Sequence, residues 1–390
     1  MTPLPSVRDL PVKGRRVFLR SDLNVPMKDG RVADDARILA SLPTLRLLVE
    51  RGASVVVASH LGRPRGQRDD RFSLAPVAER LAQLAQRPVE FVDDVAGEAA
   101  HQRAGALAPG EVLMLQNLRF EPGEERDDPD LARRLASLAD VYVNDAFGAA
   151  HRAHASTHAL ARLLPHAAGL LLLEEVRVLT GLLENPQRPF VCILGGAKVS
   201  DKLPVLRSLL PRVDRLLLGG GMANTFFLAR GLAMGQSLVE PPQVPEARAL
   251  LEAYPGRIEL PVDLVVAPSP EGPARTVAPD AVGEQDRALD VGGATVDAYA
   301  RIIAGAGCVF WNGPVGMFEK PPFDQGTLGI ARAVAEAPGF TVAGGGDSLA
   351  ALDRAGVLHQ IDHASTGGGA SLELLEGRTL PGVAALTDDG

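Results

Sequence analysis

The chain has 390 residues, a length that predicts two domains at ~100–200 residues per domain. Apolar residues make up 46% of it and charged residues 23%, the balance of a globular protein, which excludes a disordered chain. The net charge of −8 arises within residues 196–390, and neither half of the chain has the basic excess that is typical of nucleic-acid-binding proteins.

The beginning of the chain has no apolar core of the signal-peptide type. The longest wholly apolar stretch, about residues 167–173, is far shorter than the ~18 residues that a membrane span needs. Only two cysteines occur, Cys192 and Cys308, and both lie in apolar runs. We therefore expect a cytoplasmic protein without a membrane partner, whose cysteines are buried free thiols rather than a disulfide or zinc ligands.

Short apolar runs recur along the first half of the chain, and each stops at a turn signal. Near-continuous apolarity, rather than alternation, is typical of strands that are buried on both faces of a sheet. The stretches between these runs are longer and amphipathic, as helices are. Strands are predicted at residues 17–19, 54–58, 90–92, 112–115 and 141–143, and helices at 74–85 and 131–138.

The same alternation resumes after a Leu-rich segment and the polar stretch 184–189, in which two prolines favour a domain joint. Strands are predicted at residues 190–194, 216–218, 264–266, 309–311 and 340–343, and a helix at 326–337. One sheet does not comfortably hold ten such strands. We therefore expect two α/β domains, each with a parallel sheet covered by helices, joined within residues 169–189.

Ligands of open parallel sheets bind beyond the carboxyl ends of the strands. In the first half of the chain, the residues at or shortly beyond these ends are polar: Asp22, Asn24, Arg37, His60, Arg63, Asn117, Arg119, Asn144, Asp145 and Arg152. Arginine forks bind carboxylate or phosphate, so this half suits a small anionic ligand. Solvated arginines are the alternative, because 35 of the 40 basic residues are arginine.

Glycines follow the strands of the second half, at Gly195–Gly196, Gly219–Gly221, Gly313 and Gly344–Gly346. They allow a backbone to approach a phosphate closely, although glycine runs are also common in tight turns. After the last run, Asp347 is suited either to holding a metal ion or to capping a helix, and the hydroxyl of Ser348 is suited to capping.

Two of the five lysines, Lys198 and Lys202, lie four residues apart after the first glycine pair. If a helix begins there, both ammonium groups lie on one face near its N-terminus, which is unfavourable for cations without an anion nearby. A nucleotide polyphosphate explains the pair, and two solvated lysines are the alternative.

Several common motifs are absent from the chain. Without G-x-G-x-x-G a dinucleotide dehydrogenase is unsupported, and without G-x-x-x-x-G-K-[ST] the P-loop class is excluded. The spacing of His151, His154 and His158 suggests zinc, but no cysteine lies nearby, so positioned or exposed histidines are the better interpretation.

The segments at the strand ends together resemble the phosphoglycerate kinase family, over about residues 16–386. The motifs that carry the resemblance are RSDLNVP (20–26), SHLGRP (59–64), NLRF (117–120), NDAFG (144–148), HRAHAS (151–156), GGAKVSDK (195–202), WNGP (311–314) with FE (318–319), GGGDS (344–348) and STGGGA (365–370). The resemblance implies two Rossmann-like α/β domains, each a parallel sheet of about six strands flanked by helices. Its implied parts are a phosphoglycerate-binding domain (1–168), a linker helix and hinge (169–189), a nucleotide-binding domain (190–370) and a last segment (371–390) that returns to the first domain.

The resemblance also implies a reaction, the reversible transfer of a phosphoryl group from 1,3-bisphosphoglycerate to ADP, giving 3-phosphoglycerate and ATP in glycolysis. Transfer would be direct and in line after domain closure, with Arg37 and Lys198 as catalytic residues. The phosphoglycerate would bind to Asp22, Leu23, Asn24, Arg37, His60, Leu61, Gly62, Arg63, Arg119 and Arg152. The nucleotide would bind to Lys198, Lys202, Asn312, Glu319, Gly345, Gly346, Asp347 and Ser348, with Mg²⁺ held through Asp347. We expect a monomer that binds small molecules and no nucleic acid.

Three residues depart from the family pattern: Gln116 replaces the usual Glu, Ser348 replaces Thr, and Glu174 stands where Lys is frequent. None of the three departures removes a group that is expected to contact a phosphate, since Ser348 keeps the hydroxyl. Two rival functions are another ATP-dependent carboxylate kinase and a non-catalytic nucleotide-binding protein. The second would not need both the arginine set and the lysine pair.

Overall fold

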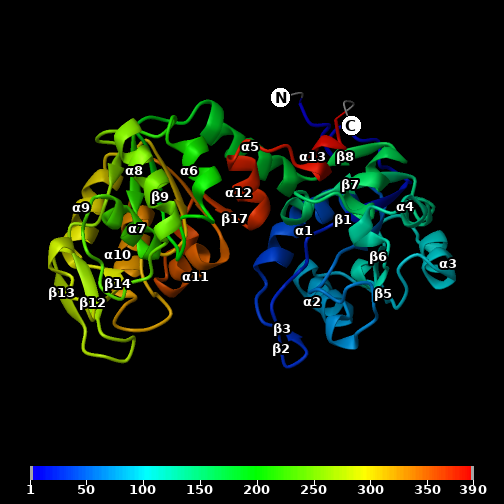
Figure 1. The fold of residues 1–390 in the computed structure, drawn as a ribbon. Coiled ribbons are helices and arrows are strands. Elements are labelled where there is room, and N and C mark those ends of the chain that lie inside the picture. The colour runs from blue at the N-terminus through cyan, green and yellow to red at the C-terminus, as the bar shows by residue number, and fades with distance from the viewer. Residues whose placement is uncertain (1–2, 388–390) are drawn as a thin grey trace. The chain divides into compact units, whose positions relative to one another are not determined.

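The computed structural model describes residues 3–387, which form two compact units (Figure 1). Unit 1 comprises the chain up to Arg177 together with the residues from Arg378 onward, and unit 2 comprises Val178–Gly377. The division falls inside helix α5 (Leu170–Glu184), and the chain returns to unit 1 at Arg378. The sequence predicts a linker helix and hinge at 169–189 and a returning segment from 371. Helix α12 (Gly369–Leu375) spans this last predicted boundary and lies in unit 2.

Unit 1 is built on a six-stranded parallel sheet in the order β5-β6-β4-β1-β7-β8. Its strands are β1 (Arg16–Arg20), β4 (Ser54–Ala58), β5 (Glu90–Val92), β6 (Val112–Leu115), β7 (Val141–Asn144) and β8 (His166–Ala168), and β2 (Met27–Lys28) pairs with β3 (Arg31–Val32) in a small hairpin. Its helices are α1 (Ala36–Glu50), α2 (Ala75–Ala85), α3 (Glu98–Ala106), α4 (Pro129–Ala136) and α13 (Pro381–Ala384).

Unit 2 has a second parallel sheet, in the order β11-β10-β9-β15-β16-β17. Its strands are β9 (Phe190–Leu194), β10 (Arg215–Leu218), β11 (Ile258–Glu259), β15 (Cys308–Asn312), β16 (Phe340–Gly344) and β17 (His363–Ser365). The helices that belong to it, besides α12, are α6 (Leu203–Leu209), α7 (Gly220–Ala229), α8 (Val244–Ala253), α9 (Gly293–Ile303), α10 (Gln325–Ala335) and α11 (Gly346–Arg354).

One predicted strand has a different role from the one expected. Residues 264–266 form part of β12 (Leu264–Ala267), which pairs antiparallel with β13 (Arg275–Val277) and β14 (Arg287–Val291) in a separate three-stranded sheet. A run of three apolar residues does not encode strand direction, because direction is set by the partners that the chain brings alongside. The short strands β8, β11 and β17 at the sheet edges were not predicted, because none of them contains two consecutive large apolar residues.

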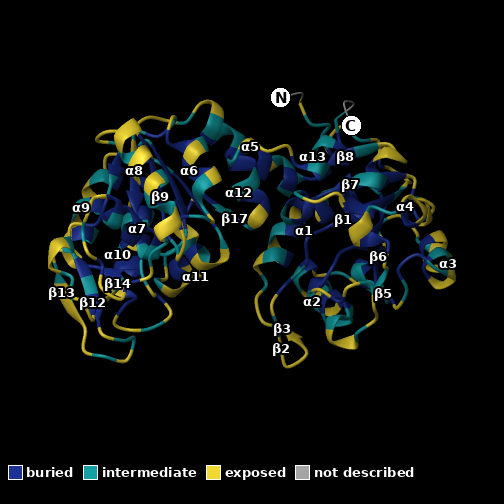
Figure 2. Ribbon diagram, viewed as in Figure 1, coloured by how far each residue is buried: buried dark blue, intermediate teal, exposed yellow. Residues whose placement is uncertain are grey.

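The central strands are buried on both faces, as their apolar runs predict. Every residue of β4, β6, β9 and β15 is buried, and Figure 2 shows the strands as the buried interior of each unit. Cys192 on β9 and Cys308 on β15 are buried free thiols, which confirms the sequence prediction. No helix within the described residues is long and apolar enough to span a membrane.

In both sheets the strand order changes direction beside the first strand of the unit. The chain places β4 on one side of β1 and β7 on the other, and places β10 and β15 on the two sides of β9. The loops that leave such a switch point diverge, which opens a crevice at the carboxyl ends of the strands. The two strand-end regions are therefore where the geometry of each unit favours a ligand.

Candidate functional site

The strand-end loops of unit 1 are tied together by side chains that reach from one loop to the next. The backbone N–H of Leu23 donates to Ser59 Oγ at 2.9 Å, that of Gly62 donates to Asn24 Oδ1 at 2.9 Å, and that of Leu61 donates to Asn117 Oδ1 at 3.2 Å. The sequence-predicted residues Leu23, Asn24, Leu61 and Gly62 thus lie together at the ends of β1 and β4.

Asp22 and Arg37 form an ion pair at the same edge. Arg37 is the second residue of α1, and its side chain is 29% exposed, whereas that of Asp22 is 7% exposed. A Cβ on Gly148 would collide with the Asp22 carboxylate, so the absence of a side chain there leaves room for this pair. The pair leaves the Arg37 guanidinium partly open to solvent, where it can meet an anion.

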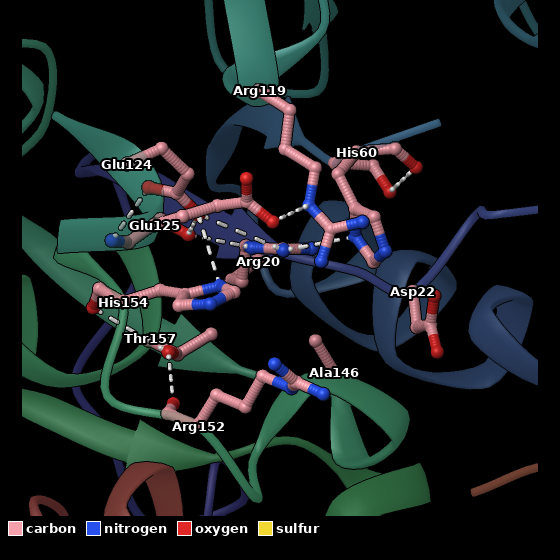
Figure 3. A network of polar contacts seen from close by, with 12 residues as sticks. Arg20, Asp22, His60, Arg119, Glu124, Glu125, Ala146, Arg152, His154 and Thr157 are labelled. Atoms are coloured by element: carbon pink, nitrogen blue, oxygen red, sulfur yellow. Dashed lines mark hydrogen bonds and ion pairs between the residues drawn. The ribbon is translucent and has the colours of Figure 1, made fainter. Parts of the chain in front are cut away.

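A buried network lies next to this pair (Figure 3). Arg20, the last residue of β1, is fully buried, and its Nε donates to Ser156 Oγ at 2.8 Å. Its Nη2 lies 3.1 Å from His60 Nδ1 and 3.9 Å from Glu124 Oε1, and the Glu124 carboxylate is fully buried as well. Tyr142 on β7 donates to the Ser156 carbonyl at 2.7 Å. The network gives an otherwise isolated buried arginine a counter-ion.

Two histidines beside this network are held neutral. Burial lowers the pKa of His60 well below its usual value, and the neighbouring Arg20, Arg119 and Arg37 lower it further. Burial together with Arg20 and Arg119 lowers the pKa of His154 to about 3, although Glu124 Oε1 lies 4.0 Å from its Nδ1. Desolvation and three arginines outweigh that one carboxylate, so we treat the contact as that of a neutral imidazole.

The remaining arginines of the predicted set differ in burial. Arg119 Nη1 donates to the Gly62 carbonyl at 2.7 Å, its Nε lies 3.3 Å from Glu125 Oε1, and burial lowers its pKa. Arg152 is exposed and its charge acts on His154, so it belongs to the same region, while Arg63 is exposed after β4. Unit 1 thus brings Asp22, Arg37, His60, Arg119 and Arg152 to one edge.

In unit 2 the loops after β9 and β15 are in backbone contact. Gly313 has φ +92°, and a Cβ there would collide with the carbonyl of Gly195. Any other residue at this position would be strained and would push the two loops apart. Part of the glycine signal in the sequence therefore reflects close packing of strand-end loops, independently of any ligand.

Lys202 and Asn312 join these loops. Lys202 Nζ donates to Asn312 Oδ1, and Asn312 Nδ2 donates to the Gly344 carbonyl at 2.7 Å. Burial lowers the pKa of Lys202. Gly345 has φ +90°, and a Cβ there would lie 2.9 Å from Asn312 Nδ2. The glycine at 345 thus allows the β16 end to approach the Lys202–Asn312 pair.

The helix that could have begun at Lys198 does not form. Residues 198–202 are irregular and turn structure, and α6 begins at Leu203, so the two lysines do not share a helix face. Pro204 favours this start, because proline is well tolerated in the first turn of a helix. Lys198 is exposed, and Ser200 holds the loop to Glu240, with its Oγ donating to Glu240 Oε1 at 2.6 Å.

Asp347 is exposed in the first turn of α11, but it does not cap that helix. The capping position is Gly345, and no side chain bonds to the free N–H groups there. Ser348, which the sequence suggested as a cap, is buried and its Oγ accepts from the Gly313 N–H at 2.7 Å. The capping explanation for Asp347 is therefore wrong, and its carboxylate is available to a ligand.

Asp347 and Glu319 line a cavity of about 330 Å³ together with Gly196, Gly220, Gly221 and Pro314. Leu238 and Met317, which are 50% and 38% exposed, supply apolar surface to the same cavity. An apolar wall with a few carboxylates and glycine backbones is the usual composition of a small-molecule site. A single exposed carboxylate beside a glycine turn also fits Mg²⁺, which prefers oxygen ligands and is usually held by one or two carboxylates plus substrate phosphates.

Sequence reasoning missed three residues that the structure places at these sites. Arg20 and Glu124 form the buried network of unit 1. Arg20 stands in the motif RSDLNVP at the end of an apolar run but was given no role, and no motif includes Glu124. Asp290 on β14 lines the cavity of unit 2, and burial raises its pKa to about 7. Its Oδ2 accepts from Gly326 N at 2.7 Å, a contact that nothing in the sequence around residue 290 indicates.

Comparison with known proteins gives one consistent family. The phosphoglycerate kinase family model matches residues 7–378. Phosphoglycerate kinases of Thermomicrobium roseum and Desulforudis audaxviator are 56% and 55% identical to this chain, covering 98% of it and 99% and 98% of their own lengths. The solved phosphoglycerate kinase structure from Coxiella burnetii is 42% identical with a TM-score of 0.89, covering 98% of this chain and 99% of that one. That from Pyrococcus horikoshii is 35% identical with a TM-score of 0.87, covering 98% of each chain.

We predict that Gln116→Glu destabilises unit 1. Gln116 is buried, its Oε1 accepts from Leu74 N and Asn117 N, and its Nε2 donates to Asp93 Oδ1 at 2.8 Å. A glutamate would place a second carboxylate next to that of Asp93. Because the Asp93 side chain is half exposed, solvent screens the repulsion, and we expect a loss of roughly 1 kcal/mol in the free energy of unfolding. Urea denaturation measures it. The double variant with Asp93→Asn should recover most of the loss, and equal losses in both backgrounds would contradict this reason.

We predict that His154 makes the protein less stable toward acid. The pKa of His154 is lower in the folded protein than in the unfolded chain, so on acidification the unfolded chain binds a proton at this histidine first. The contribution of neutral His154 to the free energy of unfolding is therefore complete above pH ~6.5 and is lost as the pH falls toward 3. Between pH 7.5 and 5 the free energy of unfolding of wild type should fall relative to His154→Gln by on the order of 2 kcal/mol. Urea titrations at the two pH values measure the difference. A difference that does not change with pH would show that His154 titrates normally.

Proposed function

Because the chain belongs to the phosphoglycerate kinase family, we propose that its two units divide the two substrates between them. The enzyme transfers a phosphoryl group reversibly between 1,3-bisphosphoglycerate and ADP, which gives 3-phosphoglycerate and ATP in glycolysis. Other carboxylate kinases and a non-catalytic binding protein are not favoured, since the family match covers nearly the whole chain.

The phosphoglycerate binds at the strand ends of unit 1. The observation that supports this assignment is the gathering of Arg37, Arg119, Arg152 and neutral His60 at one edge, with Asp22 as the only acidic member of the predicted set. A molecule that carries a carboxylate and a phosphate needs several cations and N–H donors, and arginine forks supply them with fixed geometry. Asn24 and the Leu23, Leu61 and Gly62 backbones hold the loops in place.

The nucleotide binds in unit 2, at the cavity lined by Glu319 and Asp347. The apolar wall suits a base, and the glycine loops allow phosphates to approach the backbone. Lys198 and Lys202 supply positive charge, Asn312 and Ser348 fix the loops, and Gly345 and Gly346 leave the α11 N-terminus open. Asp347 holds Mg²⁺, which when bound neutralises charge on the nucleotide phosphates.

Phosphoryl transfer needs alignment and cations around the moving group and no protein nucleophile. We assign that task to Arg37 from unit 1 and Lys198 from unit 2. Arg37 is partly exposed and Lys198 is exposed, so solvent reaches both side chains. Direct transfer requires the two substrates to meet, which is the domain closure that the family resemblance implies. We also propose that the enzyme acts as a monomer in the cytoplasm.

The division of substrates is tested by binding experiments on Arg37→Ala. We expect the dissociation constant for 3-phosphoglycerate to rise at least several-fold and kcat to fall strongly, while affinity for ADP with Mg²⁺ stays within about two-fold of wild type. Titration calorimetry and steady-state kinetics measure these quantities. A loss of nucleotide affinity with unchanged 3-phosphoglycerate binding would reverse the assignment.

We predict that Asp347→Asn weakens ADP binding only when Mg²⁺ is present. The amide keeps the shape but loses the charge that holds the ion, so affinity should fall about ten-fold or more with Mg²⁺ and little without it. Titration calorimetry with and without Mg²⁺ measures both states. Asp353→Asn, an exposed carboxylate on the same helix, is the matched control and should change neither. Equal effects with and without the ion would exclude Asp347 as its ligand.

We predict that Lys198→Arg is damaging although it keeps the charge. In a chain with 35 arginines and five lysines, a retained lysine points to a need for its compact ammonium. A wide planar guanidinium should misplace the reacting groups, and ~1 Å of displacement costs on the order of 10²-fold in rate. Single-turnover kinetics should show a fall in kcat of about that size with ADP affinity nearly unchanged. A near wild-type rate would show that charge alone suffices.

A further inference from the structure

We propose that Glu124 is a positioning residue which, through Arg20, fixes His60 as the neutral tautomer with its proton on Nε2, the form that donates to an anionic oxygen of the substrate. The tautomer and the role of Glu124 follow from the ligand-free structure. The donation to substrate rests on the proposed phosphoglycerate site, and the experiments below separate the two.

The first step is the burial of Arg20. Its side chain is fully buried at the end of β1, and a guanidinium in that position needs a negative partner, because an unpaired buried charge costs several kcal/mol. The partner is Glu124, whose Oε1 lies 3.9 Å from Arg20 Nη2. Within the described residues, Glu124 is the one carboxylate that pairs with Arg20.

The second step is the way in which Ser156 joins the two charges. Ser156 Oγ accepts from Arg20 Nε at 2.8 Å and donates to Glu124 Oε1 at 2.5 Å, and the Ser156 backbone N–H donates to Glu124 Oε2 at 3.0 Å. Arg20 Nη1 donates to the Ser21 carbonyl at 2.5 Å. The Nε and Nη1 groups are therefore fixed, and the plane of the guanidinium is fixed with them. Figure 3 shows this guanidinium between Glu124 and His60.

The third step assigns the proton of His60. Arg20 Nη2 lies 3.1 Å from His60 Nδ1, and a guanidinium can only donate. His60 Nδ1 must therefore accept, so a neutral ring carries its proton on Nε2. A doubly protonated ring would turn an N–H toward the N–H of Arg20, with Arg119 and Arg37 adding repulsion and the neutral His154 offering no counter-charge.

The consequence is a directed donor at the strand-end edge. Neutral His60 supplies an N–H donor next to Arg37 and Arg119 without adding another positive charge. A neutral ring locked by Arg20 is pre-oriented, so little ordering is needed when the ligand binds. Glu124 acts two contacts away, and it touches neither His60 nor the proposed ligand position directly.

The tautomer is tested by long-range ¹H–¹⁵N correlation spectra of ligand-free protein labelled in histidine, with His60→Gln to assign the resonance. We expect Nε2 to carry the proton and Nδ1 to be unprotonated at pH 7.5. A proton on Nδ1, or on both nitrogens, would overturn the proposal. This measurement uses the wild-type chain, so it stands even if a variant fails to fold.

The role of Glu124 is tested by Glu124→Gln, with Ser156→Ala as a second variant that keeps both charges but removes the bridge. In each we expect His60 to lose its single tautomer, KM for 3-phosphoglycerate to rise about ten-fold, and kcat and KM for MgATP to change less than about three-fold. Glu121→Gln is the matched control, because Glu121 pairs with Arg134 at the surface of the same segment. It should change none of these.

The outcomes distinguish the positioning of His60 by Glu124 from the donation of His60 to the substrate. An unchanged His60 spectrum in folded Glu124→Gln would overturn the positioning role. A lost tautomer with unchanged KM for 3-phosphoglycerate would contradict donation from His60 to the substrate, while the tautomer assignment would stand. A parallel rise in KM for both substrates would indicate a general loss of structure and would also contradict a specific positioning role.

Discussion

All six strands of each main sheet run in the same direction, and this constraint places the chemistry of the molecule. In a parallel sheet every strand ends at one edge, so residues far apart in the chain meet there. Asp22, His60 and Arg119 follow three different strands of unit 1, and Gly195, Gly313 and Gly345 do so in unit 2. Covering both faces with helices then forces the strands to be apolar, which leaves the strand-end loops to carry the polar residues.

The two strand-end regions differ in the groups that they offer to an anionic ligand. Unit 1 concentrates cations, and it limits their mutual repulsion by pairing Arg37 with Asp22, balancing Arg20 with buried Glu124 and keeping two histidines neutral. Unit 2 relies on backbone. At Gly195, Gly220 and Gly313 the loops are packed so closely that a side chain would collide with neighbouring backbone, and Lys202 is hydrogen-bonded to Asn312. Fixed N–H groups and a few mobile charges suit a polyphosphate, whereas fixed arginine forks suit a smaller acid.

The residues of the two strand-end regions that the sequence did not predict are those whose interactions depend on burial. Arg20, Glu124 and Asp290 are buried charged groups, and in a buried setting a contact is worth far more than at the surface. Gln116 is buried as well, and its side chain accepts from two backbone N–H groups and donates to the Asp93 carboxylate. These residues hold the loops and side chains that they contact.

The sequence predicts the α/β class, the central strands, the buried free cysteines and the family, because apolar runs and ordered motifs are local signals. It also named the residues at the strand ends, although their roles in binding remain proposals. The three-dimensional structure was needed to show that residues 264–267 pair antiparallel, that α6 begins after Lys202 and that Asp347 does not cap α11. It alone joined Arg20 to Glu124 across more than a hundred residues. Strand direction, helix starts and buried pairs are fixed by which distant segments pack together, and a local pattern carries no record of that choice.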